Sequence, residues 1–268
     1  AGRLGLPDVP HGKYPPVPQD RQNYYIWVDK APAHIHLKVT VQRVWDLRPH
    51  KISLFSPKAA GPPAKKGART QLGRSRWSLA TTRARGAHGT GHETKNVNIE
   101  AVDTSGIVRA DGKTYDVVLK TPHDGLHRIE SRDGGDYTRF VWPERMAVTI
   151  PSGMSTAGIS NHFRGGWTLY CYVPKGTKVF GGWSARIAQW APPVSGTLEN
   201  ADGEVMIDFG KIDPGWFSCP VPEGQDDKLW KFANCQGVRQ LSTVPPYLAI
   251  TAKDLLLPKE VVEADAKK

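Results

Sequence analysis

Residues 34–41, with the sequence HIHLKVTV, carry apolar side chains at every second position, namely Ile35, Leu37, Val39 and Val41. On an extended chain, side chains two positions apart point to the same side, so this alternation predicts a strand with one buried face. The period-two pattern recurs in two other segments, 97–101 and 205–209. Further short runs of strand-forming residues lie at 24–28, 115–119, 137–142, 167–173 and 228–232.

Turn-forming residues separate these predicted strands. They occur at 110–112 (ADG), 133–135 (DGG), 202–203 (DG) and 213–215 (DPG). Many short strands joined by tight turns, without helical segments between them, are typical of antiparallel β-sandwiches. Pro258 is suited to open one short helix over 259–266, because proline is favoured at the start of a helix. The sequence therefore predicts an all-β chain with a short C-terminal helix.

The two halves of the chain resemble each other at two points. The segment 25–30 (YIWVDK) is similar to 170–175 (YCYVPK), and 122–126 (PHDGL) is similar to 213–216 (DPGW). Pro, Ser and Gly cluster between the halves, within 151–164. We therefore expect two tandem β-sandwich domains of a jelly-roll-like kind. The predicted boundaries are an N-terminal extension at 1–20, a first domain at 21–155 and a second domain at 156–268.

Most of the positive charge lies in one segment. The formal net charge is +10, and residues 57–95 contain nine Lys or Arg against a single Glu, which is +8 of that total. Because the segment is rich in Gly, Pro and Ala and has no strand or helix period, we interpret it as a long insertion in the first domain. It is either a solvated loop or an arm that binds polyanions. The candidate polyanion-binding residues are Arg74, Arg76, Trp77, Arg83 and Arg85.

The second half also resembles a known group of domains. The run 170–177 (YCYVPKGT) looks like the first strand of bacterial pre-peptidase C-terminal-type domains. The segments 213–217 (DPGWF) and 229–232 (LWKF) are similar to later strands of those domains and of jelly-roll carbohydrate-binding modules. Such modules accompany secreted bacterial hydrolases and aid attachment or substrate binding. The resemblance therefore implies an extracellular or periplasmic protein that works with a polysaccharide, and with a larger parent enzyme or a cell surface.

Tryptophan is unusually frequent, with nine residues in the chain. Sugar rings have apolar C–H faces that stack on aromatic planes, and nearby polar groups can bind their hydroxyls. Trp183 and Trp190 flank a short segment before two prolines, and Trp216 follows a Pro-Gly turn, so these rings are placed near loops. The alternative is that tryptophans fill the core, which we expect for Trp167 and Trp230. The predicted carbohydrate-binding residues are Trp183, Trp190, Arg186, Gln189 and Trp216.

Metal binding has weak candidates. His34 and His36 leave the same face of their strand and could hold a metal together with His88 or His92, but they share that face with residues suited to solvent. Asp226 and Asp227, or the carboxylates near 130–136 and 202–204, could hold a structural calcium ion. We expect no other cofactor.

Catalytic residues cannot be assigned from the sequence. Glu130, Asp133 and Asp136 form the densest group of carboxylates, but their spacing by three and the turn at 133–135 favour a hairpin over a catalytic pair. The Asp202 and Glu204 pair also brackets a turn. The chain has no Ser-His-Asp arrangement and no phosphate-binding loop.

The three cysteines allow one disulfide. Cys219 and Cys235 both lie in the second half, and their spacing permits a bond in an oxidising compartment. Cys171, in an apolar strand, is expected to be a buried thiol. No segment is long and apolar enough to predict a membrane span.

Three functions are compatible with these features. The first is a non-catalytic carbohydrate-binding accessory module, in which the basic insertion would favour acidic glycans. The second is a polysaccharide-active enzyme, a glycoside hydrolase or lyase, with a β-sandwich cleft. The third is a structural or adhesive cell-surface protein. Nucleic-acid binding comes last, because the basic run lacks a recognised reading module.

Overall fold

The computed structural model describes residues 2–3, 17–44, 49–57, 99–144, 146–152, 163–164, 166–187, 189 and 191–267. Its strands form antiparallel sheets, so the all-β prediction is confirmed. The first lobe is built from the strands β2 (Val17–Val28), β3 (Ala33–Gln42), β4 (His50–Pro57), β5 (Ile99–Val108), β6 (Thr114–Thr121) and β7 (Gly125–Val141).

The second lobe contains most of the later strands. They are β10 (Trp167–Val173), β11 (Val179–Ala185), β12 (Ser195–Glu199), β13 (Val205–Asp208), β14 (Gly215–Pro220), β15 (Lys228–Gln236) and β16 (Val238–Leu241). The segments between and beside the lobes are β1 (Gly2–Arg3), β8 (Val148–Pro151), β9 (Phe163–Arg164), β17 (Tyr247–Ala249), a short 3-10 helix (Ala252–Asp254), β18 (Leu256–Leu257) and α1 (Lys259–Ala266).

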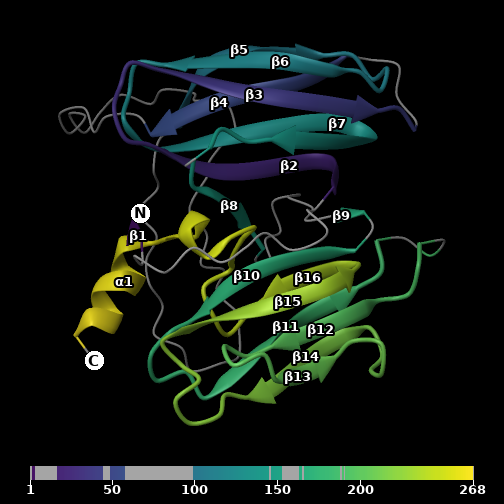
Figure 1. The fold of residues 1–268 in the computed structure, drawn as a ribbon, viewed down its shortest axis with the longest axis vertical. Helices are drawn as coiled ribbons and strands as arrows, with labels where there is room; N and C mark the ends of the chain where they lie inside the picture. The colour runs from purple at the N-terminus through teal and green to yellow at the C-terminus, as the bar shows by residue number, and fades with distance from the viewer. Residues whose placement is uncertain are drawn as a thin grey trace, which may run out of the picture.

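One long sheet runs through both lobes (Figure 1). Its main path is β13-β12-β15-β10-β17-β8-β2-β7-β3-β6. Off this path, β4 pairs with β7, β5 pairs with β4, and β9 pairs with β2. The link between the lobes is made by β17, which pairs with β8, and by β8, which pairs with β2. The lobes are therefore joined by main-chain hydrogen bonds as well as by the connecting chain.

The apolar residues of the predicted alternation form part of the core of the first lobe. Ile35, Leu37, Val39 and Val41 of β3 are at most 1 % exposed, as their period-two spacing predicts. The strand β7 pairs with three other strands. Its first half lies between β2 and β4, and its last residues pair with β3.

The prediction of a turn at 133–135 is wrong. These residues lie inside β7, which continues from Gly125 to Val141. Gly134 and Gly135 have φ angles of 60° and 95°, a region that glycine adopts without steric cost. The two glycines therefore bend a continuous strand instead of reversing the chain.

The second lobe is a sandwich of two sheets. The end of the long sheet faces a separate three-stranded sheet with the order β14-β11-β16. Aromatic rings fill the space between them, and the ring of Phe180 on β11 stacks on Trp230 of β15 at 5.2 Å between centroids. Trp167 and Trp230 are both 0 % exposed, so their assignment to the core is confirmed.

Two smaller predictions are also confirmed. The helix α1 spans the predicted residues 259–266, after Pro258 at its N-cap. The Asp202-Gly203 segment is the turn of a hairpin between β12 and β13, in which the Asn200 N–H donates to the Glu204 carbonyl at 3.0 Å.

The two halves do not pair alike at their similar segments. In the first lobe, Val28 of β2 lies opposite Gly125 of β7. In the second lobe, β10 pairs with β15 and β17, whereas Gly215 begins β14, which pairs with β11 in the other sheet. Of the predicted boundaries, 20/21 falls inside β2, and 155/156 lies outside the described residues, as does the insertion from 58 onward.

Candidate functional site

The outer face of the three-stranded sheet carries the residues that best suggest a ligand. In the register of this sheet, Trp183 of β11 lies opposite Trp216 of β14 on one side and Gln240 of β16 on the other. Residues opposite each other in antiparallel strands project to the same side, so the three side chains form one row across the sheet. We call this row, together with Ser218 on β14, the tryptophan face.

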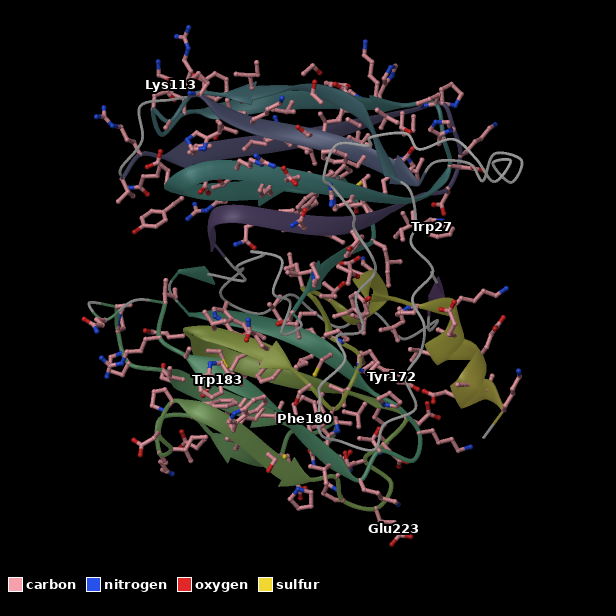
Figure 2. The ribbon with its side chains drawn as sticks, turned by 180° about the vertical axis from the view of Figure 1, so that it is seen from behind. Trp27, Lys113, Tyr172, Phe180, Trp183 and Glu223 are labelled. Atoms are coloured by element: carbon pink, nitrogen blue, oxygen red, sulfur yellow. The ribbon has the colours of Figure 1, made fainter. Side chains whose placement is uncertain are left out.

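The two indole rings contact each other at a steep angle. Their centroids are 5.4 Å apart and their planes cross at 78°. Trp216 is 65 % exposed, whereas Trp183 is half-buried. Figure 2 shows Trp183 on the strands of the second lobe. An edge-to-face pair of this kind is a favourable aromatic arrangement, and it leaves much of the Trp216 ring open to solvent.

Small polar groups surround the rings. Ser218 is exposed and lies opposite Gly181, which has no side chain to cover that position of β11. The exposed Ser242 and Thr243 follow β16, and both hydroxyls bond to the main chain of Gly181. The Ser242 hydroxyl donates to the Gly181 carbonyl at 3.0 Å, and the Thr243 hydroxyl accepts from the Gly181 N–H at 2.7 Å. The hydroxyls and the half-buried Gln240 amide therefore supply uncharged donors and acceptors beside the aromatic pair.

The tryptophan face rests on a close-packed support. Directly beneath it, Phe180 stacks on Trp230 with an angle of 7° between the planes. Phe217, next to Trp216 on β14, meets Phe209 edge to face at 5.1 Å. Because these rings are buried in the sandwich, the strands that carry Trp183 and Trp216 are held in place from below.

The other predicted carbohydrate-binding residues are less well placed. Arg186 and Gln189 are exposed and follow the end of β11, so they lie beyond the row that contains Trp183 and Trp216. Trp190 lies outside the described residues. The predicted polyanion-binding residues are also outside them, namely Arg74, Arg76, Trp77, Arg83 and Arg85.

The metal candidates have other surroundings. His34 and His36 are exposed on β3 with ring centroids 6.5 Å apart. Asp226 accepts a hydrogen bond from the Gly176 N–H at 2.6 Å, which lowers the pKa of its carboxyl group, and Asp227 accepts one from the Tyr172 hydroxyl. Among the described residues, no three His, Cys, Asp or Glu side chains are grouped to hold a metal ion.

The densest group of carboxylates is buried in the first lobe. Glu130, Asp133 and Asp136 are 5 %, 1 % and 0 % exposed. Glu130 accepts a hydrogen bond from Arg132 Nε at 2.5 Å, and Asp136 lies 3.2 Å from His50 Nε2. These carboxylates are therefore engaged in the interior of the lobe.

All three cysteines are buried free thiols. Cys219 lies on β14 and Cys235 on β15, and the disulfide that their spacing allows is not formed in this structure. Burial raises the pKa of Cys219 to about 11 and that of Cys235 to about 12. Cys171 is a buried thiol on β10, as predicted.

Two residues of the tryptophan face are absent from the sequence-based prediction. Ser218 is two positions after Trp216 on the same strand, so its placement beside the ring follows from the alternation of β14. Gln240 carries no such signal, because it reaches Trp183 only through the pairing of β16 with β11.

Within the described residues, no helix has the length and apolar character needed to cross a membrane. The main candidate for a binding site is the open Trp183–Trp216 pair with its uncharged polar neighbours.

Comparisons of the chain with protein-family models, with curated proteins and with solved structures found no match.

Proposed function

We propose that this chain is a non-catalytic carbohydrate-binding unit and that the tryptophan face is where the glycan binds. The observation that carries the proposal is the pairing of the 65 % exposed Trp216 with Trp183 at 5.4 Å on one open sheet face. Aromatic rings of this kind contact the apolar faces of sugar rings, and the hydroxyls and amide around them match the sugar's polar edge.

The wider setting is part of the same proposal. The resemblance to accessory modules supports tandem jelly-roll-like lobes in a secreted bacterial polysaccharide-processing system, attached to a parent enzyme or to a cell surface. Binding of acidic glycans by the basic insertion at 57–95 stays a separate prediction about that segment, whose basic residues lie outside the described ones, and does not concern the tryptophan face.

A binding assay with a matched pair of variants tests the proposal. Affinity for a panel of polysaccharides is measured by depletion and calorimetry for the unchanged protein, for Trp216→Ala and for Ile107→Ala. Ile107 is a suitable control, because it is 64 % exposed, close to the value for Trp216, but lies on β5 of the first lobe. We expect Trp216→Ala to weaken glycan binding at least about tenfold, as for a central aromatic contact, and Ile107→Ala to leave it unchanged.

The same assay separates the alternatives. Release of sugar products or of unsaturated ends during incubation would identify a polysaccharide-active enzyme. Tight self-association without binding to any glycan would support a structural or adhesive protein. Binding that is equally strong in Trp216→Ala would contradict the assignment of the tryptophan face.

A further inference from the structure

The angle between the two indoles restricts the shape of the ligand. A flat crystalline polysaccharide surface needs aromatic rings that lie in one plane, because each ring stacks on a sugar of the same layer. Trp183 and Trp216 cross at 78°, so their faces cannot both lie against one plane. A single glycan chain can instead stack one sugar on the open Trp216 ring while the edge of that sugar contacts the Trp183 indole.

The packing around Trp183 keeps this angle. Trp183 is the central residue of its row and is half-buried between Trp216 and Gln240. Its indole contacts that of Trp216 on β14 edge to face, with 5.4 Å between the ring centroids. Turning Trp183 into the plane of Trp216 would require these contacts to be given up.

The charge of the tryptophan face restricts the ligand further. None of its four residues is ionisable, and Arg239, next to Gln240 on β16, is buried on the opposite side of the sheet against Phe209. An acidic sugar would lose hydration on binding there without gaining a charged partner, which is unfavourable. The exposed ionisable residues closest to the two tryptophans along their strands, Asp213 before β14 and Arg186 after β11, are of opposite sign.

We propose that the tryptophan face binds a single, uncharged glycan chain in solution, and neither a crystalline polysaccharide surface nor an acidic polymer. This inference rests on the proposed glycan-binding function and specifies its substrate class. Because the contacts are uncharged, binding should not weaken when salt is added.

The experiment compares three classes of polymer. Soluble neutral chains are mixed-linkage β-glucan, xyloglucan and galactomannan. Crystalline surfaces are microcrystalline cellulose and α-chitin, and acidic polymers are polygalacturonate and heparin. Each is tested at low and high salt with the unchanged protein, Trp216→Ala, Trp216→Tyr and the control Ile107→Ala. Circular dichroism and unfolding curves establish that each variant is folded.

The expected result is binding to at least one soluble neutral chain that salt does not change. Trp216→Ala should weaken it at least about tenfold, whereas Trp216→Tyr should retain most of it because the aromatic face is kept. Trp216-dependent binding to crystalline or acidic polymers, without a neutral soluble ligand, would overturn the inference and leave the proposed function standing. If the protein shows no Trp216-dependent binding to any of the three polymer classes, the proposed function itself is overturned.

Discussion

The two lobes share antiparallel β-structure but stabilise their interiors differently. The first lobe is filled by aliphatic side chains, such as Ile35, Leu37 and Ile52, which are at most 1 % exposed. The second is filled by rings, including Trp230 and Phe180, which are 0 % exposed. A period-two pattern therefore specifies which face of a strand is buried but not what packs against it.

Charged groups inside the lobes differ as well. In the first lobe, the buried Asp136 carboxylate lies 3.2 Å from the buried His50 ring, an acid facing a base. In the second, the guanidinium of Arg239 lies 3.9 Å above the ring of Phe209 and donates to main-chain carbonyls, with Nη2 at 2.8 Å from that of Ser195. Burial lowers the pKa of Arg239. Each lobe thus buries an arginine over an aromatic ring, with Arg128 at 4.3 Å above Phe55 in the first, but the first lobe also buries an acid–base pair.

The largest expected effect concerns the aromatic core of the second lobe. Trp230→Ala should lower the free energy of unfolding by about 4 kcal/mol, because the fully buried indole leaves a cavity against Phe180. Trp216→Ala in the same lobe should lower it by about 1 kcal/mol or less, because that ring is 65 % exposed and loses mainly its edge-to-face contact with Trp183. Urea unfolding measures both. Equal losses for the two variants would show that the lobe does not depend on its ring core.

The next effect tests the buried charges of the first lobe. Asp136→Ala should cost about 3 kcal/mol, because it leaves His50 and the Val44 N–H without the carboxylate that they contact. Asp116→Ala, which removes the exposed ion pair with Lys38, should cost less than about 1 kcal/mol. Chemical denaturation of the two variants measures the difference. A small loss for Asp136→Ala would mean that aliphatic packing alone maintains this lobe.

The smallest effect is a loss of unfolding free energy at alkaline pH, caused by two buried thiols of the second lobe. The pKa values of Cys219 and Cys235, about 11 and about 12, lie above the ordinary value of 9.0, so the folded state keeps these protons where the unfolded state loses them. Their contribution is complete below about pH 9 and is lost as the pH rises toward the folded values. Between pH 7 and pH 10, each thiol should account for about 1 kcal/mol of lost stability.

The check is to measure unfolding free energies at both pH values for the unchanged protein and for Cys219→Ala/Cys235→Ala. The difference between pH 7 and pH 10 should shrink in the double variant, whatever its stability at pH 7. An unchanged difference would show that these thiols are not shielded from solvent in the folded state.

Much of the local structure is predictable from the sequence. The alternation at 34–41, the hairpin at Asp202-Gly203 and the helix over 259–266 all follow from backbone preferences within a few residues. The predicted turn at 133–135 does not form, because Asp-Gly-Gly suits both a reversal and a bend, and the choice depends on what pairs with the strand on either side.

The candidate site divides in the same way. Residue type and nearby turns identify Trp183 and Trp216 as glycan-binding candidates, but 33 positions of chain separate them. Their contact, and the position of Gln240 beside them, depend on the order β14-β11-β16. Cys219 and Cys235 show the reverse case, because their spacing along the chain permits a disulfide but both are free thiols in the fold.

Strand faces, most of the turns, the C-terminal helix and the concentration of positive charge in one segment are properties of the sequence alone, because they depend on near neighbours and composition. Three features exist only at the tertiary level: which strands pair, the single sheet that runs through both lobes, and the steep contact of two tryptophans on an open face. The physical reason is that long-range strand pairing is selected by the burial of whole faces against each other, which no short stretch of sequence encodes.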